Sequence, residues 1–246
     1  MKSNAKFLMI TTRTEPAILT SEVEMLRKLS GLDSNQLVWH RLEQSPLPPL
    51  NLDEWAGVIL CGSPFDSLAP IEKKSDVQLR VEAELQDLMD QLVAKDFPFL
   101  GICYGVGTLL GHQGGKISEK YGESISAPVI ELTQQGREDP ITRGIPNTFR
   151  AYVGHKEACE QLPESATLLA RGEACPIQLF KVKQNMYGTQ FHPELDWPAL
   201  KLRIIGYAAS GYYQPDDQQR IIDQCIDVDV APGHKIISNF VDMYAR

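Results

Sequence analysis

The chain has 246 residues, of which 43% are hydrophobic and 23% charged, a composition typical of a globular protein with a sizeable core. It carries 24 Lys and Arg against 32 Asp and Glu, a formal net charge of −8. This acidic balance does not supply the basic surface that binds phosphate backbones, so we expect no nucleic-acid partner. The apolar run 7–10 is too short for a secretory signal, and nothing approaches the roughly 18 apolar residues of a membrane span.

The five cysteines are widely spaced and include no Cys-x-x-Cys pair. This spacing argues against a disulfide framework and against a zinc cluster, and it predicts a protein of the reducing cytoplasm. No glycine-rich nucleotide loop is present either. We therefore expect neither a metal nor another cofactor.

The first half of the chain alternates short apolar runs with amphipathic segments. The runs predict strands at 6–12, 37–42, 57–61 and 98–102, and the amphipathic segments predict helices at 21–29, 75–95 and 106–110. Strands that alternate with helices are typical of an α/β fold. We predict a doubly wound, mostly parallel sheet flanked by helices.

The second half is expected to be richer in strands, forming a smaller antiparallel section. Strands are predicted at 126–132, 149–154, 167–170, 177–182 and 186–191. Two helical stretches, 200–205 and 220–222, flank a predicted turn at Gly211-Tyr212-Tyr213, and a closing helix covers 236–240. Without a convincing linker, we expect one domain over 1–246, in which about 197–234 form an additional C-terminal segment.

A cysteine stands at the junction between a predicted strand and the following helix. The sequence Gly101-Ile102-Cys103-Tyr104-Gly105 is G-x-C-x-G, the thiol counterpart of the G-x-S-x-G nucleophile elbow. The glycines permit a sharp turn, and a helix N-terminus directed at the sulfur favours the thiolate. A buried structural cysteine at a tight connection is the alternative reading of this pentapeptide.

A second motif supplies a base for this cysteine. His192-Pro193-Glu194 follows another apolar strand, and residues two apart lie on the same side of an extended chain. Glu194 could then orient one imidazole nitrogen of His192 while the other accepts the proton of Cys103. The three residues form a candidate catalytic triad.

With these motifs the sequence resembles the class I glutamine amidotransferases, whose glutaminase domains use a cysteine, histidine and glutamate triad. The resemblance covers roughly residues 5–195 and rests on GICYG at 101–105, TQFHPE at 189–194, CGSP at 61–64 and YVGHKE at 152–157. It implies release of ammonia from glutamine, or from a γ-glutamyl amide, through a thioester at the cysteine.

The resemblance also implies roles for residues outside the triad. The backbone N–H groups of Ser63 and Tyr104 would form the oxyanion hole. Gly62, Gly154 and His155 would contribute to the substrate site.

The sequence departs from the family pattern just after the nucleophile and again in its C-terminal part. Many members carry His and Gln three and four residues after the nucleophile, where this chain has Val106 and Gly107. This difference keeps open a γ-glutamyl peptide or amine hydrolase that serves no ammonia acceptor. The segment 197–234 is the second departure, and we expect it to be a surface elaboration, a lid or an oligomer contact.

The partners are left open by the sequence. Besides its small-molecule substrate, the chain could work with a synthetase partner as a regulatory or ammonia-delivering subunit. It could equally form a homo-oligomer.

Overall fold

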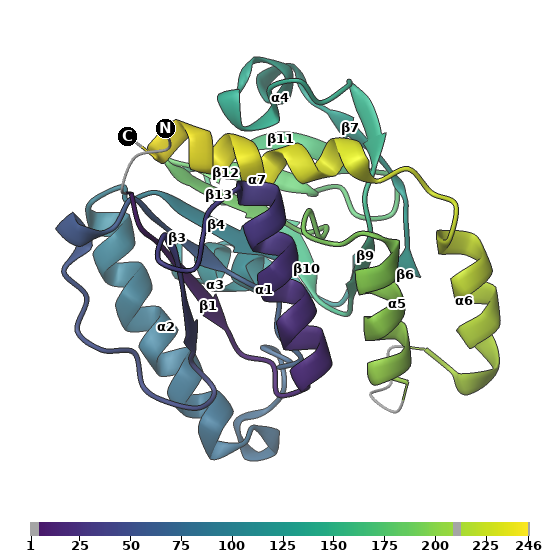
Figure 1. Ribbon diagram of the computed structural model, residues 1–246, viewed down its shortest axis with the longest axis horizontal. Helices are drawn as coiled ribbons and strands as arrows, with labels where there is room; N and C mark the ends of the chain where they lie inside the picture. Colours follow the sequence, from purple (N-terminus) through teal and green to yellow (C-terminus); the bar gives the residue numbers. More distant parts are fainter. Residues whose placement is uncertain (1–4, 209–212, 246) are drawn as a thin grey trace.

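The computed structural model describes residues 5–208 and 213–245. A nine-stranded sheet with strand order β2-β1-β3-β4-β13-β12-β11-β7-β8 forms its centre (Figure 1). Strands β2, β1, β3, β4 and β13 run parallel, and the remaining four continue the same sheet in antiparallel pairings. The nine strands are β1 Phe7–Thr11, β2 Leu37–Arg41, β3 Gly57–Leu60, β4 Phe99–Ile102, β7 Val129–Leu132, β8 Thr148–Arg150, β11 Ala166–Gly172, β12 Leu179–Val182 and β13 Met186–Thr189.

Two small antiparallel sheets and seven α-helices complete the described fold. The small sheets pair β5 Lys116–Ser118 with β10 Ala158–Gln161, and β6 Glu123–Ser126 with β9 Val153–His155. The helices are α1 Pro16–Ser30, α2 Asp76–Ala94, α3 Tyr104–His112, α4 Gln134–Glu138, α5 Trp197–Gly206, α6 Gln218–Cys225 and α7 Ala231–Tyr244. Among the described helices, none combines the length and the apolar character needed to cross a membrane.

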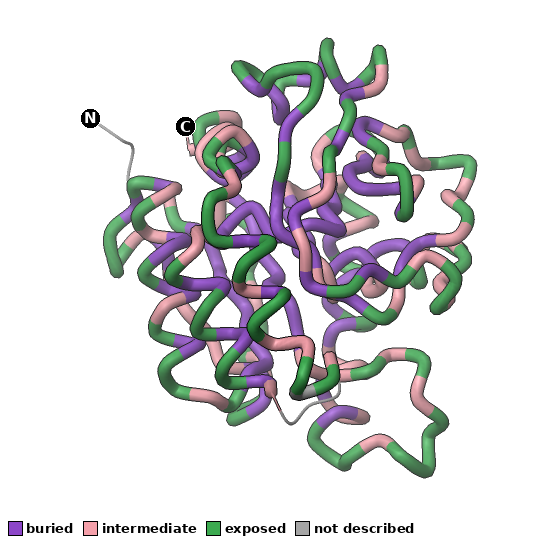
Figure 2. Tube along the Cα trace, turned by 90° about the vertical axis from the view of Figure 1, so that its right-hand side faces the viewer, coloured by how far each residue is buried: buried purple, intermediate pink, exposed green. Residues whose placement is uncertain are grey.

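The alternating side chains of the central strands build a separate core on each face of the sheet. Phe7 and Met9 of β1 join the core formed with α1 and α7, whereas Leu8 and Ile10 join the core formed with α2 and α3. The chain is correspondingly buried through the centre of the molecule and exposed along the outer helices (Figure 2). This layering confirms the predicted α/β fold with a mostly parallel sheet.

Two of the predicted strands are wrong, because each is divided between two separate strands in the structure. The run 126–132 is divided between β6 and β7, and the run 149–154 between β8 and β9, so each run contributes to two different sheets. Pro128 interrupts the first run, because proline cannot donate a ladder hydrogen bond. Helix α1 also begins at Pro16, five residues before the predicted start, with the proline in its first turn. In the predicted turn, Gly211 and Tyr212 lie outside the described residues.

The C-terminal segment, residues 197–234, places helix α5 beside α1 and helix α6 outside α5. Helices α5 and α6 lie together at one side of the molecule, and α5 contacts α1 (Figure 1). A third apolar cluster joins Leu200 and Ile204 of α5 to Ile221 and Cys225 of α6. This cluster fixes α5 against the body of the protein at the carboxyl ends of the parallel strands.

We predict that helix α7 is a major source of stability. Phe240 is fully buried, and its ring packs edge-on against Phe7 at 6.0 Å and Tyr244 at 5.1 Å. The change Phe240→Ala should lower the free energy of unfolding by about 3–5 kcal/mol, because it leaves a cavity between the helix and the sheet. Urea denaturation measures this loss.

A matched control is Ile71→Ala, because Ile71 is 73% exposed. Its free energy of unfolding should change by no more than about 0.5 kcal/mol. Equal losses in the two variants would contradict the assignment of α7 to the core.

Candidate active site

Cys103 occupies a strained turn between β4 and α3. Its backbone has φ 53° and ψ −89°, a left-handed conformation that is rare for a residue with a side chain. Only glycine fits at position 101, because a Cβ atom there would clash with the carbonyl group of Gly105 in α3, at 2.7 Å. The thiol therefore stands at the carboxyl edge of the sheet, where α/β proteins bind ligands.

The backbone of Cys103 is tied to the strand that leads to the candidate histidine. Its N–H donates to the carbonyl oxygen of Thr189 at 2.7 Å, which continues the parallel pairing of β4 with β13. His192 follows β13 after two residues, so the two strand ends carry the candidate nucleophile and the candidate base to the same edge. Gly62 lies between them, because a Cβ atom on Gly62 would be 2.9 Å from Cε1 of His192 and 3.7 Å from Cβ of Cys103.

The Glu194 carboxylate faces one imidazole nitrogen of His192, the arrangement that the sequence predicts. Nδ1 of His192 lies 2.7 Å from Oε1 of Glu194, and both side chains are buried. The backbone N–H of His192 also donates to the carbonyl oxygen of Tyr152 at 2.8 Å. This bond anchors the histidine to the segment 152–157, the predicted wall of the substrate site.

A cavity of about 160 Å³ opens beside Cys103. Its lining includes four residues predicted from the sequence, namely Ser63, Tyr104, Gly154 and His155, together with Val106 and Gly107. Tyr104 is the first residue of α3, where backbone N–H groups have no partner within the helix and can serve an oxyanion. Gly62 packs against His192, whereas the other predicted binding residues face the cavity.

Two carboxyl groups lie at this cavity. Burial and a hydrogen bond with Asp66 raise the pKa of Glu157 to about 7, whereas the hydrogen bond with Glu157 lowers the pKa of Asp66. Glu157 also accepts from the backbone N–H of Leu68 at 2.9 Å and from the hydroxyl of Ser67. The pair provides negative charge that can bind the ammonium group of a ligand.

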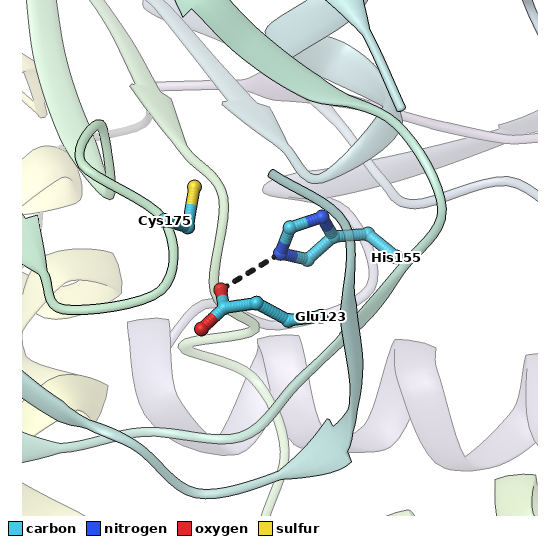
Figure 3. Close-up of side chains that lie close together, drawn as sticks. All are labelled: Glu123, His155 and Cys175. Carbon is cyan, nitrogen blue, oxygen red and sulfur yellow. Dashed lines mark hydrogen bonds and ion pairs between the residues drawn. The ribbon is translucent and has the colours of Figure 1, made fainter. Parts of the chain in front are cut away.

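His155 is held by a second buried cluster behind the cavity wall. Its Nδ1 lies 3.0 Å from the carbonyl oxygen of Glu157, and its Nε2 lies 2.9 Å from Oε2 of Glu123 (Figure 3). Gln178 donates to the same carboxylate oxygen at 2.7 Å. His155 thus fixes the turn that carries Glu157, which is a structural contribution to the cavity.

The same cluster gathers side chains of types that can bind metals. The ligand atoms of Glu123, His155 and Cys175 lie within 4.8 Å of one another, although the sequence spacing predicts no metal site. These atoms already engage one another or the backbone, since Cys175 donates to the carbonyl oxygen of Ile177 and burial raises its thiol pKa to about 12. Three ligands also fall short of the four that a structural zinc ion takes.

Gln190, within the TQFHPE motif, places its Nε2 4.0 Å from the sulfur of Cys103. Two further residues at the site carry no recognisable sequence signal. His234 of α7 contacts the carbonyl oxygen of Pro193 at 2.7 Å. Arg203 of α5 lies 2.9 Å from Oε1 of Glu194, nine residues after the motif. Only the three-dimensional fold brings these side chains to the triad.

Burial sets the protonation state of the resting site. It raises the pKa of Cys103 to about 12 and lowers the pKa of His192. Burial also favours protonated Glu194, but His192 and Arg203 beside it outweigh this effect and hold its pKa at about 2. These shifts favour a thiol at Cys103 and a neutral imidazole at His192 in the resting site, whereas the helix N-terminus considered in the sequence favours the thiolate.

Comparison with known families gives a match over most of the chain. The family model described as "Glutamine amidotransferase class-I" matches residues 33–204. Among similar sequences, a GMP synthase [glutamine-hydrolyzing] of Thermosipho melanesiensis is 33% identical over 111 residues, which are 45% of this chain and 21% of that protein. One subunit of the GMP synthase [glutamine-hydrolyzing] of Thermococcus kodakarensis is 37% identical over 99 residues, or 40% of this chain and 51% of that subunit.

These matches span about a fifth of the first relative and about half of the second. Similar solved structures extend the likeness of the fold to nearly the whole chain. A glutamine amidotransferase of Thermotoga maritima has a TM-score of 0.75 at 21% identity, covering 97% of this chain and 99% of its own. A glutamine amido transferase of Methylobacillus flagellatus has a TM-score of 0.71 at 14% identity, covering 98% and 95%.

We predict that Cys103 reacts slowly with iodoacetamide at neutral pH. Its pKa is about 12, so the reactive thiolate fraction should rise about tenfold for each pH unit between about pH 7 and 9. Mass spectrometry of the alkylated peptide measures the rate, and Cys103→Ala identifies the background. A rate that is already constant across this range would contradict a thiol in the resting site.

Proposed function

Because the chain belongs to the glutamine amidotransferase class-I family, we propose that it hydrolyses the side-chain amide of glutamine through a thioester at Cys103. The observation that carries this proposal is the strained turn of Cys103, hydrogen-bonded to the end of the strand that leads to His192. The cavity beside the sulfur offers room for the substrate. Water and glutamine would yield glutamate and ammonia.

The first half of the reaction forms the thioester. Nε2 of His192 takes the proton of the Cys103 thiol as the sulfur bonds to the amide carbon. The tetrahedral intermediate carries an oxyanion, which the backbone N–H groups of Ser63 and Tyr104 would stabilise. The imidazolium then returns the proton to the leaving nitrogen, the carbon–nitrogen bond breaks, and ammonia departs.

The second half regenerates the thiol. His192 takes a proton from water as the water oxygen bonds to the thioester carbon, and a second oxyanion forms in the same place. Collapse of this intermediate breaks the carbon–sulfur bond, and the sulfur recovers its proton from His192. Glu194 stabilises the imidazolium in both halves, because its carboxylate faces Nδ1 at 2.7 Å.

The carboxyl groups at the cavity suit an amino-acid substrate. Glu157 and Asp66 together can bind the α-ammonium group of glutamine, which places the γ-amide toward the cysteine. The pKa of about 7 for Glu157 makes this pair doubly charged above neutrality.

A wider specificity, for γ-glutamyl peptides or amines, is the second candidate function. Gly107 lines the cavity at the position where many family members carry Gln, and a Cβ atom there would meet its nearest neighbour, Oγ of Ser67, at 3.8 Å. The absence of a side chain at Gly107 leaves space beside the reacting amide. A substituent on the amide nitrogen could occupy that space.

We also propose a synthetase partner, since the similar proteins include chains named as single subunits of GMP synthase. In that setting the chain would deliver ammonia. All five cysteines are free, which suits the reducing cytoplasm and keeps the nucleophile available.

Replacement of the nucleophile tests the proposed reaction. We predict that the wild-type protein releases ammonia from glutamine and that Cys103→Ala loses this activity by at least about 10³-fold, since no thioester can form. A coupled glutamate dehydrogenase assay measures the ammonia. Cys159→Ala is the matched control, because Cys159 is buried in the core on the α2–α3 face of the sheet and does not line the cavity, so turnover should stay unchanged. Ammonia release at the wild-type rate by Cys103→Ala would refute the mechanism.

A substitution at Gly107 separates the two specificities. Gly107→Gln should lower the KM for glutamine and reduce turnover of γ-glutamyl anilides by about tenfold, because its side chain fills the space beside the amide. Parallel kinetics with both substrates measure the change. If both substrates respond equally, Gly107 does not determine specificity.

A further inference from the structure

An arginine of the C-terminal segment reaches into the triad. Arg203 lies on α5 and is 7% exposed. Its Nη2 lies 2.9 Å from Oε1 of Glu194 and 2.7 Å from Oε1 of Glu22 on α1. One guanidinium group therefore bridges the triad carboxylate to the helix that covers the sheet.

This bridge belongs to a buried and balanced set of charges. Glu22 also accepts from Nε of Arg13 at 3.2 Å, so two arginines face two glutamates, and all four residues are buried. Arg13 in turn donates to the hydroxyl of Tyr207, which follows α5. Such groups are stable in the interior because each charge has an opposite partner, and removal of one leaves another uncompensated.

The geometry around His192 determines which of its nitrogens carries the proton. Nη1 of Arg203 lies 3.1 Å from Nδ1, which already faces Oε1 of Glu194 at 2.7 Å. An arginine N–H can only donate, so Nδ1 cannot serve both partners as a hydrogen-bonding atom. The shorter contact is to the carboxylate, and Nδ1–H donates to it. Nε2 then keeps its lone pair for the proton of Cys103.

We propose that Arg203 is a positioning residue, which holds the Glu194 carboxylate against Nδ1 of His192 and so keeps Nε2 available as the base. This inference rests on the hydrolysis proposed above. It makes α5 a necessary part of the active site, beyond a surface elaboration, a lid or an oligomer contact. No sequence motif contains Arg203.

The contacts of Glu194 indicate that, among the described residues, no other side chain could hold its carboxylate if Arg203 were lost. Oε1 accepts from both His192 and Arg203, whereas Oε2 is buried without a hydrogen-bond partner in the described part of the chain. Without Arg203, the carboxylate would keep His192 as its one side-chain partner among the described residues. A free rotation of the carboxylate would then release the imidazole from its orientation.

Arg203 also influences the charge of the base. The charged groups that face His192 are Glu194 from its own segment, Arg203 from α5 and Arg13 from the loop after β1. Cys103, which precedes α3, lines the same small cavity as His192. Burial lowers the pKa of His192, and the two arginines act in the same direction, against Glu194. Loss of the Arg203 cation should therefore raise the pKa of His192.

The test compares Arg203→Met with the wild-type protein. Arg203 does not line the cavity of about 160 Å³ that would hold the substrate, although it lines a smaller one of about 40 Å³ beside Cys103 and His192. We expect kcat for glutamine to fall about 10²-fold while KM stays unchanged, because the arginine acts through Glu194. The acidic limb of the kcat/KM profile should move to higher pH, because His192 becomes easier to protonate. A variant that merely loosens the fold would not shift this limb.

Arg203→Lys keeps the cation but replaces the two-pronged group with a single ammonium. We expect its acidic limb to stay at the wild-type pH and its kcat to fall about tenfold. Arg220→Gln on α6 is the matched control, since Arg220 is exposed and pairs with Asp217, and it should retain full activity.

An NMR titration of the His192 ring separates this inference from the proposed function. The ring signal, assigned with His192→Asn, should titrate at higher pH in Arg203→Met whether or not glutamine is the substrate. Wild-type kcat and an unmoved His192 titration in folded Arg203→Met would overturn the inference. If Arg203→Met does not fold, full kcat in Arg203→Lys would overturn it.

Discussion

The pairing of β4 with β13 is the constraint on which the site depends. These strands are far apart in the chain but adjacent and parallel in the sheet, with Ile102 opposite Thr189. The hydrogen bond from Cys103 N–H to Thr189 extends this pairing by one residue, into the turn itself. The distance between the candidate nucleophile and the candidate base is therefore set by the most buried part of the sheet, where the backbone has least freedom to move.

The parts of the site that lie within one continuous stretch of sequence could be predicted from that stretch. Gly101 and Gly105 around Cys103 indicate a tight strand-to-helix turn, and the two-residue spacing of His192 and Glu194 indicates a shared side of the chain. Both arrangements are local, so their geometry follows from backbone rules alone. The parallel sheet was predictable for the same reason, because its strands are short continuous apolar runs.

The remainder of the site depends on contacts between distant segments. Glu22 and Arg203 are 181 positions apart, and a charged residue on an amphipathic helix normally indicates a solvated face. The raised pKa of Cys103 could not be predicted either, since it follows from the loss of solvent around the sulfur in the fold, which the local motif does not contain. The divided strands at 126–132 and 149–154 show the same limit, because apolar alternation does not specify which sheet a residue joins.

The position of Arg203 in the chain has a consequence for synthesis on the ribosome. The strand order places β13 between β4 and β12, so the central sheet cannot close before residue 189 has left the exit tunnel. The arginine that orients Glu194 emerges later still, followed by the helix α7 that covers one face. A nascent chain would thus expose Cys103 as an ordinary thiol, and the candidate site would form only when α5 and α7 fold onto the sheet.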